Sequence, residues 1–240
     1  MLDRHSEIAV TPETAFYDEI VPNLRPGDGA HLRQLLGGWT RPAELGLNVD
    51  RVVRHCGPDP SPLHLLGGML ELYARDRGKA HCGEKTPQHL RHVPRILADF
   101  PNARVLCLLR DGRDVVLSLR SMPWRPENWS AVDAWLDAVR LSDLFAAQYP
   151  ACFLVVRYED LVAQPEKTLV SVMDFLGLPF EAGGLVPGPS DVVLRRSLEW
   201  KGFALGPIDR NLAEHRRRSA GDLDLLNDVL GPVLKRLGYS

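Results

Sequence analysis

The sequence predicts an α/β protein with a small parallel sheet flanked by helices. Two short apolar runs, at residues 105–109 and 152–157, and a further short strand predicted at 80–84 each lead into a stretch with apolar residues at helical spacing. Continuous apolar runs are typical of strands covered on both faces, and strands that alternate with helices are typical of parallel sheets with right-handed crossovers. The 45% of hydrophobic and 25% of charged residues are ordinary for a globular chain.

Length and charge narrow the possible classes of function. At 240 residues the chain can form one sizeable core, and we expect a single domain over residues 1–240. The formal net charge of −2 argues against a general nucleic-acid or membrane-surface role. No apolar run approaches the roughly 18 residues that a transmembrane helix needs, and the N-terminus lacks the apolar core of a secretion signal. We therefore expect a cytoplasmic protein with no membrane span and no nucleic-acid partner.

The cysteines form neither a metal-binding nor a disulfide pattern. They lie far apart, without a CxxC pair or a nearby histidine at zinc spacing, at Cys56, Cys82, Cys107 and Cys152. We expect buried free thiols in a reducing compartment, and no metal site.

The N-terminal part of the chain is predicted to be mainly helical. Thr11 suits a helix N-cap and Pro12 the first helical position, so that Glu13 falls in the first turn, where a carboxylate interacts favourably with the helix dipole. Residues 24–77 form a region of short helices punctuated by Pro and Gly, of which the last spans about residues 63–77.

Lys85 lies between a predicted strand and a predicted helix. The strand covers residues 80–84, and Thr86 and Pro87 are a suitable cap and first residue for the helix. The carboxyl end of a strand next to a helix N-terminus favours anions, so Lys85 is a candidate anion ligand. The alternative is a solvated lysine in a loop.

A second strand-to-helix corner follows the run at 105–109. The strand stops at Arg110, and helical spacing begins with Val115 and Val116. Arg110 is then at the carboxyl end of a parallel strand, where open α/β sheets bind ligands, and Ser118 lies about two turns into the helix. Such a corner suits a phosphate. The alternative for Arg110 is an ion pair with a neighbouring acid.

The remainder supplies one more strand and three helices. Asn128 can cap a helix that extends to about Gln148, in which we interpret the tryptophans as packing residues rather than as the lining of a ligand pocket. The strand at 152–157 leads into Tyr158 and then a helix at 165–176, and the last helix follows a cap at residues 219–222. We interpret the arginine run at 216–218 as a solvated surface.

Four stretches together resemble the sulfotransferases that use 3′-phosphoadenosine 5′-phosphosulfate (PAPS), in particular the bacterial and tyrosylprotein-like branch. They occur in the family's order and are HSEIAVTPET, GEKTPQHLRHVPRIL, LLRDGRDVVLSL and RYEDLVAQPEKTL. The resemblance implies a P-loop-like three-layer α/β fold, with residues 24–77 as a helical cap over the acceptor site.

The family's functional residues transfer to five positions. Glu13 matches the catalytic base of the tyrosylprotein branch, and Lys85 matches the lysine that contacts the transferring sulfuryl group and the bridging oxygen. Arg110 and Ser118 match the ligands of the 3′-phosphate, and Tyr158 matches the tyrosine near the adenine. The resemblance implies PAPS as co-substrate, 3′-phosphoadenosine 5′-phosphate as product, no metal, and a small-molecule or peptide acceptor.

The residue types fit this chemistry. Sulfuryl transfer passes through a loose in-line state like that of phosphoryl transfer, so the protein mainly positions groups and stabilises charge. A carboxylate accepts the proton of the acceptor's hydroxyl, phenol or amine, and a lysine meets the charge that grows on the leaving oxygen.

One element of the family is absent from the sequence. The 5′-phosphosulfate loop, a turn resembling Arg-Ser-Gly-Thr-Thr after the first strand, should precede HSEIAV by one helix. We therefore expect an N-terminally truncated domain. The missing first strand belongs between the strands at 105–109 and 152–157, which leaves these two with unpaired edges or forces them together.

Two other functions compete with a complete sulfotransferase. One is an inactive fragment of the fold that binds nucleotide or serves as an interaction module, and we expect little or no turnover by residues 1–240 alone. The other, a P-loop kinase or nucleotidase, is the weakest, because no GxxxxGK[ST] motif is present.

Overall fold

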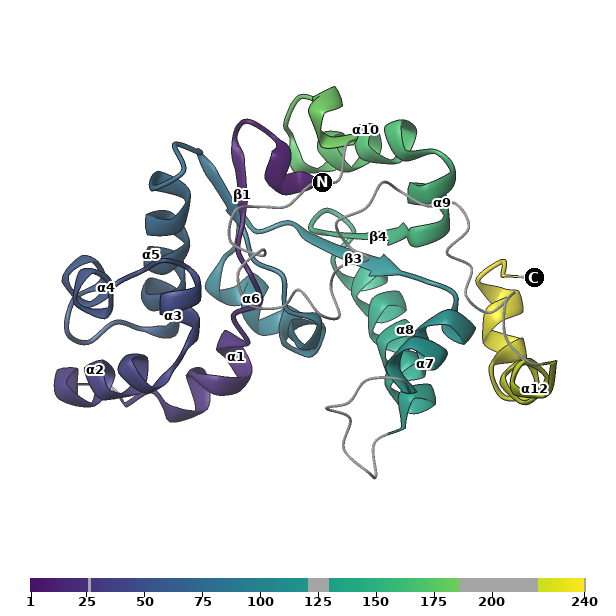
Figure 1. Ribbon diagram of the computed structural model, residues 1–240, viewed down its shortest axis with the longest axis horizontal. Helices are drawn as coiled ribbons and strands as arrows, with labels where there is room; N and C mark the ends of the chain where they lie inside the picture. Colours follow the sequence, from purple (N-terminus) through teal and green to yellow (C-terminus); the bar gives the residue numbers. More distant parts are fainter. Residues whose placement is uncertain (26, 121–129, 186–219, 240) are drawn as a thin grey trace. The chain divides into compact units, whose positions relative to one another are not determined.

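The computed structural model describes residues 1–25, 27–120, 130–185 and 220–239 (Figure 1). Parallel strands alternate with helices, which confirms the predicted α/β class. The described residues form two compact units. The first unit contains residues 1–103 and 181–185, and the second contains residues 104–180 and 220–239.

The first unit is mainly helical around two short strands. Its strands are β1 (Ile8–Val10) and β2 (His81–Gly83). Its α-helices are α1 (Phe16–Glu19), α2 (Gly29–Gly38), α3 (Arg41–Glu44), α4 (Val49–Cys56), α5 (Pro62–Arg75) and α6 (Val93–Asp99). Its 3-10 helices are η1 (Leu2–Arg4), η2 (Val21–Asn23), η3 (Pro87–His92) and η4 (Ala182–Leu185).

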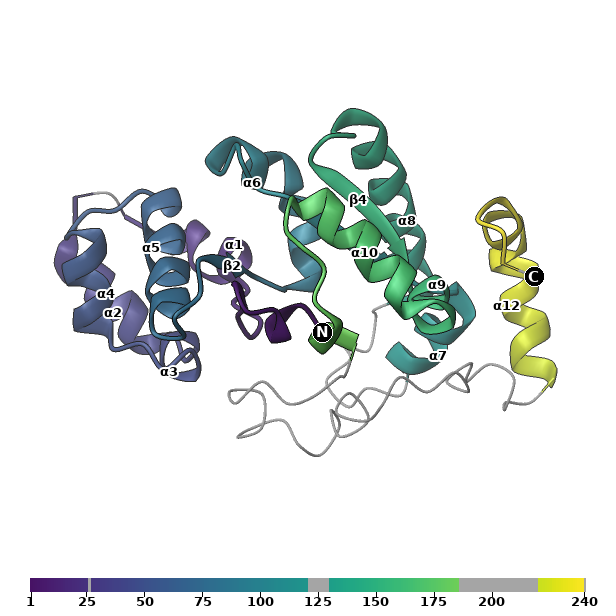
Figure 2. The same cartoon turned by 90° about the horizontal axis from the view of Figure 1, so that it is seen from above.

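Strands β1 and β2 are parallel, and α5 packs against both of them. The register pairs Ile8 with His81 and Val10 with Gly83. Helix α5 is the buried centre of the unit, because six of its side chains are buried, at Leu65, Leu66, Met69, Leu72, Tyr73 and Ala74. Figure 2 shows α2, α3 and α4 grouped around α5, so the predicted helical region at 24–77 is confirmed as helical.

The second unit is built on the strand pair β3 (Val105–Leu109) and β4 (Phe153–Arg157). Its helices are α7 (Gly112–Arg120), α8 (Ala131–Gln148), α9 (Tyr158–Ala163), α10 (Pro165–Leu176) and α12 (Ala220–Arg236). In Figure 1, α7 and α8 lie on one side of these strands and α10 lies on the other. Helix α10 ends at Gly177, whose φ of 75° is the left-handed conformation that favours glycine at a helix C-terminus.

Strands β3 and β4 are parallel and are hydrogen-bonded directly to each other, from Val105 opposite Phe153 to Leu109 opposite Arg157. Of the two arrangements that we expected in the absence of a strand between them, the structure has the one in which they come together. The core beside them joins α7, α8 and α12, and it includes Val116, Trp135 and Leu230.

Several details differ from the prediction. The described strands form two two-stranded sheets, because β2 pairs with β1, and β1 itself was not predicted. Helix α8 is capped by Ser130, whose hydroxyl accepts a hydrogen bond from the backbone of Asp133, while the predicted cap Asn128 is outside the described residues. The arginine run at 216–218 is also outside them.

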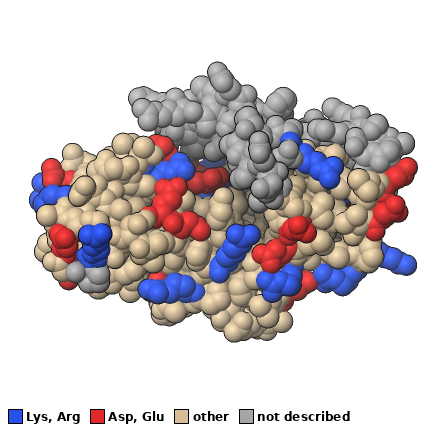
Figure 3. Space-filling model, turned by 90° about the horizontal axis from the view of Figure 1, so that it is seen from below, with Lys and Arg blue, Asp and Glu red and all other residues tan. Residues whose placement is uncertain are grey.

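The charged side chains on the face drawn in Figure 3 are mixed in sign. Among the described residues of this face, neither Lys and Arg nor Asp and Glu form a continuous area.

Candidate active site

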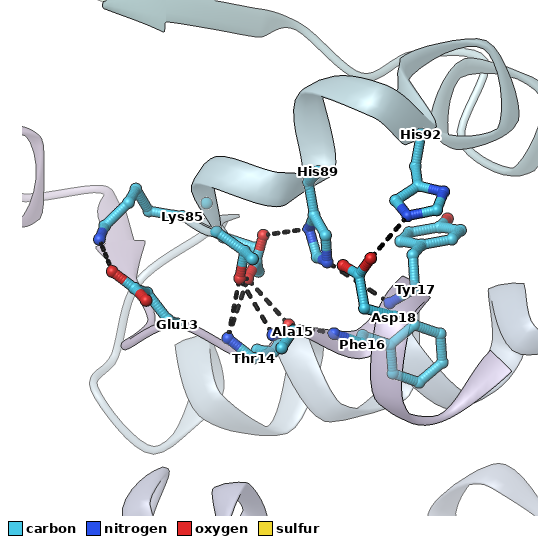
Figure 4. A network of polar contacts seen from close by, with 12 residues as sticks. Glu13, Thr14, Ala15, Phe16, Tyr17, Asp18, Lys85, His89 and His92 are labelled. Carbon is cyan, nitrogen blue, oxygen red and sulfur yellow. Dashed lines mark hydrogen bonds and ion pairs between the residues drawn. The ribbon is translucent and has the colours of Figure 1, made fainter. Parts of the chain in front are cut away.

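Glu13 and Lys85 are brought into direct contact by the strand pair of the first unit. Glu13 follows β1 and Lys85 follows β2, so both lie beyond the carboxyl ends of two paired parallel strands. The Nζ of Lys85 forms an ion pair with Oε1 of Glu13 (Figure 4). The side chain of Lys85 is 58% exposed and that of Glu13 is 31% exposed, so ligands can reach both groups.

The predicted helix around Glu13 is wrong. The Thr11 backbone N–H donates to the carbonyl of Gly83 at 2.9 Å, which continues the pairing of β1 with β2 beyond Val10. Helix α1 begins only at Phe16. Glu13 is therefore in a loop, and its partner is Lys85 rather than a helix dipole.

A largely buried glutamate beside Lys85 connects the loop that follows β1 with the loop that follows β2. Oε1 of Glu84 accepts hydrogen bonds from the Thr14 backbone N–H at 3.0 Å, the Thr14 hydroxyl at 2.8 Å and the Thr86 hydroxyl at 2.5 Å. Its Oε2 contacts Nδ1 of His89 at 2.8 Å. Burial alone would raise the pKa of Glu84, but the hydrogen bonds from His89, Thr86 and Thr14 outweigh it and hold the pKa below its usual value.

The Thr86 hydroxyl acts across the loops rather than as a helix cap. Thr86 precedes η3 as predicted, but its side chain makes no capping hydrogen bond there. Instead it accepts from the backbone N–H groups of Thr14 at 3.1 Å and Ala15 at 3.0 Å. Ala15 has a φ of 51°, in the left-handed region, which costs a non-glycine residue roughly 1–3 kcal/mol and persists only where surrounding contacts enforce it.

In the second unit, Arg110 and Tyr158 lie next to each other. Leu109 and Arg157 are partners in the parallel register, so the residues that follow them leave the sheet side by side. The guanidinium carbon of Arg110 is 4.7 Å from the centroid of the Tyr158 ring, which is cation–π geometry. Both residues are partly buried.

The backbone at Arg110 is fixed from two sides. The indole Nε1 of Trp135 donates to the carbonyl of Arg110 at 3.0 Å, and the backbone N–H of Asp111 donates to Oε1 of Glu159 at 2.9 Å. The Asp111 carboxylate also forms a buried bidentate ion pair with Arg113, at 3.0 and 2.6 Å. The buried Trp135 agrees with the predicted packing role of the tryptophans.

Arg110 also has the ion-pair partner that the alternative interpretation expected. One of its terminal nitrogens lies 3.0 Å from Oδ2 of Asp114, a carboxylate that is 4% exposed. The guanidinium is 23% exposed and is therefore held between an acid and an aromatic ring with one part open to solvent. Ser118 lies about two turns into α7, as predicted, and is partly buried.

The structure thus assembles two pairs of the five predicted residues. Glu13 and Lys85 are joined in the first unit, and Arg110 and Tyr158 are joined in the second, which also contains Ser118. The residues that hold these pairs were not predicted as part of the site, and they are Thr14, Glu84, Thr86, His89, Trp135 and Glu159. The sequence signal for the first group was available, because Glu84 and Thr86 flank Lys85 directly.

No set of side chains suited to a metal ion occurs among the described residues. None of the helices within the described ranges is long and apolar enough to cross a bilayer. All four cysteines are free thiols, as predicted, but they are partly rather than fully buried. Burial raises the pKa of Cys82 to about 12.

Comparison with known proteins was made for sequence and for structure. The model of the sulfotransferase family matches residues 1–182. The chain is 25% identical over 261 residues to protein-tyrosine sulfotransferase 2 of Gallus gallus, and the match covers all of this chain and 64% of that relative. The chain thus spans less than two thirds of that relative's length.

Two solved structures share the fold. A sulfotransferase domain from the Synechococcus PCC 7002 olefin synthase superposes with a TM-score of 0.64 at 20% identity, over 96% of this chain and 87% of that one. A sulfotransferase domain from the curacin biosynthetic pathway gives a TM-score of 0.61 at 19% identity, over 100% of this chain and 91% of that one. The family match and the shared fold agree, and this chain belongs to the sulfotransferase family.

Proposed function

We propose that this protein transfers a sulfuryl group from PAPS to the hydroxyl, phenol or amine of a small-molecule or peptide acceptor. The observation that carries the proposal is the ion pair between Glu13 and Lys85. These residues are far apart in the sequence, and each was selected for a separate role in one reaction. Their contact supports a shared reaction centre.

The two side chains divide the chemistry between them. The Glu13 carboxylate accepts the acceptor's proton as its oxygen or nitrogen attacks sulfur. The Lys85 ammonium stabilises the negative charge on the phosphate oxygen from which the sulfuryl group departs. In the absence of substrates the two charges neutralise each other, and entry of the acceptor and the phosphosulfate between them replaces this contact with the reacting groups.

The nucleotide is assigned to the corner at the end of β3. Arg110 and Ser118 are proposed to bind the 3′-phosphate, with Tyr158 near the adenine. The Arg110 guanidinium supports this role, because its charge is oriented by Asp114 and by the Tyr158 ring while part of it remains exposed. PAPS and its product carry a 3′-phosphate, whereas ATP lacks it. Arg110 would therefore allow the protein to distinguish these nucleotides from ATP.

Binding and turnover test the proposal separately. Titration calorimetry with 3′-phosphoadenosine 5′-phosphate should show tighter binding than with ATP, and equal binding of the two would contradict the nucleotide assignment. Transfer of radiolabelled sulfate from PAPS should then require Glu13 and Lys85, with E13Q and K85M lowering the rate at least about 100-fold. The matched controls are E166Q and K167M, at two exposed positions of α10.

The acceptor is found with a panel of phenols, sugars, lipids and peptides. Tyrosine peptides are the first choice, because the relative from Gallus gallus is named a protein-tyrosine sulfotransferase. Preferential nucleotide binding without transfer to any acceptor would favour the alternative, a nucleotide-binding fragment of the fold. Transfer that survives both E13Q and K85M would exclude the proposed reaction centre.

A further inference from the structure

We propose that Glu84 is a positioning residue that holds Glu13 and Lys85 opposite each other, acting through Thr86 and His89. The proposal rests on the proposed function, because it assigns a role to the residues behind the reacting pair. Glu84 directly precedes Lys85, and its main contact, Thr14, directly follows Glu13. Lys85 therefore adjoins the residue that carries this carboxylate, and Glu13 adjoins the residue that is hydrogen-bonded to it.

The hydrogen bonds at Glu84 leave little freedom between the two loops. The carboxylate is 12% exposed, and its Oε1 accepts from the hydroxyl and the backbone N–H of Thr14. An ionised carboxylate can only accept hydrogen bonds, and Thr14, Thr86 and His89 of the first unit donate to it. Charge-assisted hydrogen bonds of this kind are shorter and stronger than neutral ones.

Thr86 forms the second connection between the two loops, and its hydroxyl makes all three of its possible hydrogen bonds. A hydroxyl has one proton to donate and two lone pairs with which to accept. The proton goes to Glu84, and the lone pairs accept from the backbone of Thr14 and Ala15. These contacts fix the left-handed conformation of Ala15, two residues after Glu13, so the turn that directs Glu13 toward Lys85 depends on them.

His89 completes the arrangement from the other side and determines which proton faces Glu84. Nε2 of His89 lies 3.4 Å from the backbone nitrogen of Tyr17, which can only donate. Nε2 is therefore the acceptor, and Nδ1 carries the proton that is donated to Oε2 of Glu84. A carboxylate is the acceptor that this tautomer requires.

The substitution E84Q conflicts with this pattern although it preserves size. The side chain of glutamine ends in a carbonyl oxygen, which accepts, and an NH₂ group, which donates. The oxygen is needed at the Oε1 position, where Thr14 and Thr86 donate. The NH₂ group would then face the Nδ1–H of His89, so that two donors oppose each other. If the His89 proton moved to Nε2, that nitrogen would face the backbone N–H of Tyr17, again donor to donor. At least one hydrogen bond of His89 is therefore lost with either tautomer.

Lysine labelling measures this positioning without any need for turnover. The protein is treated with a limiting amount of N-hydroxysuccinimidyl acetate, and acetylation of each lysine is followed by mass spectrometry. The ion pair with Glu13 shields Lys85, so E84Q should raise its initial labelling rate about two- to fivefold, as for loss of an exposed ion pair. The variant E13Q removes the same ion pair directly, so its Lys85 labelling rate gives the largest increase that E84Q can cause.

Two other lysines are internal controls. Lys167 is exposed on α10 in the second unit, and its rate should not change. Lys79 is 18% exposed and donates to the carbonyls of Asp3 and Ile8, so its rate reports whether the first unit is intact. If E84Q does not fold, T86V tests the same link, with T86S as its matched control because serine keeps the hydroxyl.

The labelling rates of Lys85 and Lys79 decide whether Glu84 positions the reacting pair. A rise at Lys85 in E84Q and T86V, with Lys79 unchanged and T86S like the wild type, supports the positioning role. An unchanged Lys85 rate in both, while E13Q raises it, overturns the proposal. An equal rise at Lys79 and Lys85 in both variants also overturns it, because Glu84 would then support the whole unit rather than the reacting pair.

Kinetics add a second readout if the protein transfers sulfate. The variant E84Q should lower kcat about 10- to 100-fold, as expected for a small misplacement of reacting groups, and leave the KM for PAPS nearly unchanged. A change confined to KM contradicts the positioning role. If residues 1–240 transfer no sulfate, as expected for a chain without the 5′-phosphosulfate loop, the labelling experiment still decides the role of Glu84. Equal binding of 3′-phosphoadenosine 5′-phosphate and ATP would refute the proposed function and leave the labelling result unaffected.

Discussion

The guanidinium of Arg110 lies over the ring of Tyr158, although 47 residues separate them in the chain. The parallel register explains this contact, because Leu109 and Arg157 are paired and the next residue on each strand leaves the sheet at the same edge. Sequence spacing alone could not indicate that these two side chains touch. The contact joins two residues that were assigned to the phosphate and to the adenine of one nucleotide.

Replacement of Arg110 should abolish the preference for a 3′-phosphorylated nucleotide. We expect R110A to weaken binding of 3′-phosphoadenosine 5′-phosphate about 10- to 100-fold, the range for a hydrogen bond to a charged group, and to leave ATP binding nearly unchanged. Titration calorimetry of both ligands measures this difference. The control is R140A, since Arg140 is exposed on α8 and forms a local ion pair with Asp137. An equal loss for both ligands would contradict a role specific to the 3′-phosphate.

Two substitutions of Tyr158 should distinguish the contribution of its ring to nucleotide binding from that of its hydroxyl. The cation–π contact needs only the ring, so Y158F should bind 3′-phosphoadenosine 5′-phosphate about as well as the wild type. Y158L removes the ring and should weaken binding about two- to fivefold, as for a contact of about 0.5–1 kcal/mol. The same titration decides between them. A large loss in Y158F would show that the hydroxyl, not the ring, is important.

Gly112 should not tolerate a side chain. A Cβ atom at this position would lie 2.7 Å from the buried ring of Trp135, whose indole N–H is bonded to the carbonyl of Arg110. We expect G112A to lower the free energy of unfolding by about 1–3 kcal/mol, as for other overpacked cores. Urea denaturation measures this value. The matched control is G231A in α12, where a Cβ meets nothing within 4 Å and alanine should be neutral or slightly stabilising.

Acid should remove the stabilisation that Glu84 provides. The folded pKa of Glu84 lies below its usual value, so its contribution is complete above an unfolded pKa of about 4.3 and is lost as the pH falls through the folded value. At pH 7 we expect E84Q to be less stable than the wild type by about 1–3 kcal/mol. The difference should narrow below about pH 4, in urea denaturation at several pH values. The exposed E166Q should show no such narrowing, and a constant difference for E84Q would contradict this explanation.

The sequence predicted the elements with strong local signals. The strand at Val105–Leu109 and the helix at Pro165–Leu176 match the prediction, because a continuous apolar run and a glycine stop are local features. The contact between Glu13 and Lys85 was not predicted. The family resemblance gave both residues a role in one reaction, and the pairing of β1 with β2 is the physical cause of their contact.

The wrong helix start at Thr11 and the missed strand β1 have a common physical reason. Thr11 and Pro12 have the local pattern of a helix start, but pairing of the short β1 with β2 extends to Thr11 and overrides it. The same long-range contact explains why β1 was missed, since Ile8–Val10 is too short for a periodicity signal. Glu84 and His89 were missed because hydrogen bonding between distant loops leaves no repeating pattern in one sequence.

The parallel register of β1 and β2 has a consequence for changes in chain length. Glu13 lies three residues beyond Val10 and Lys85 two residues beyond Gly83, and Val10 and Gly83 are partners in the ladder. Inserting or deleting a single amino acid between Val10 and Glu13 would therefore carry the carboxylate away from the ammonium, even if both side chains were retained. Variation in length is expected to be accommodated elsewhere, in the surface loops between the helices at 24–77.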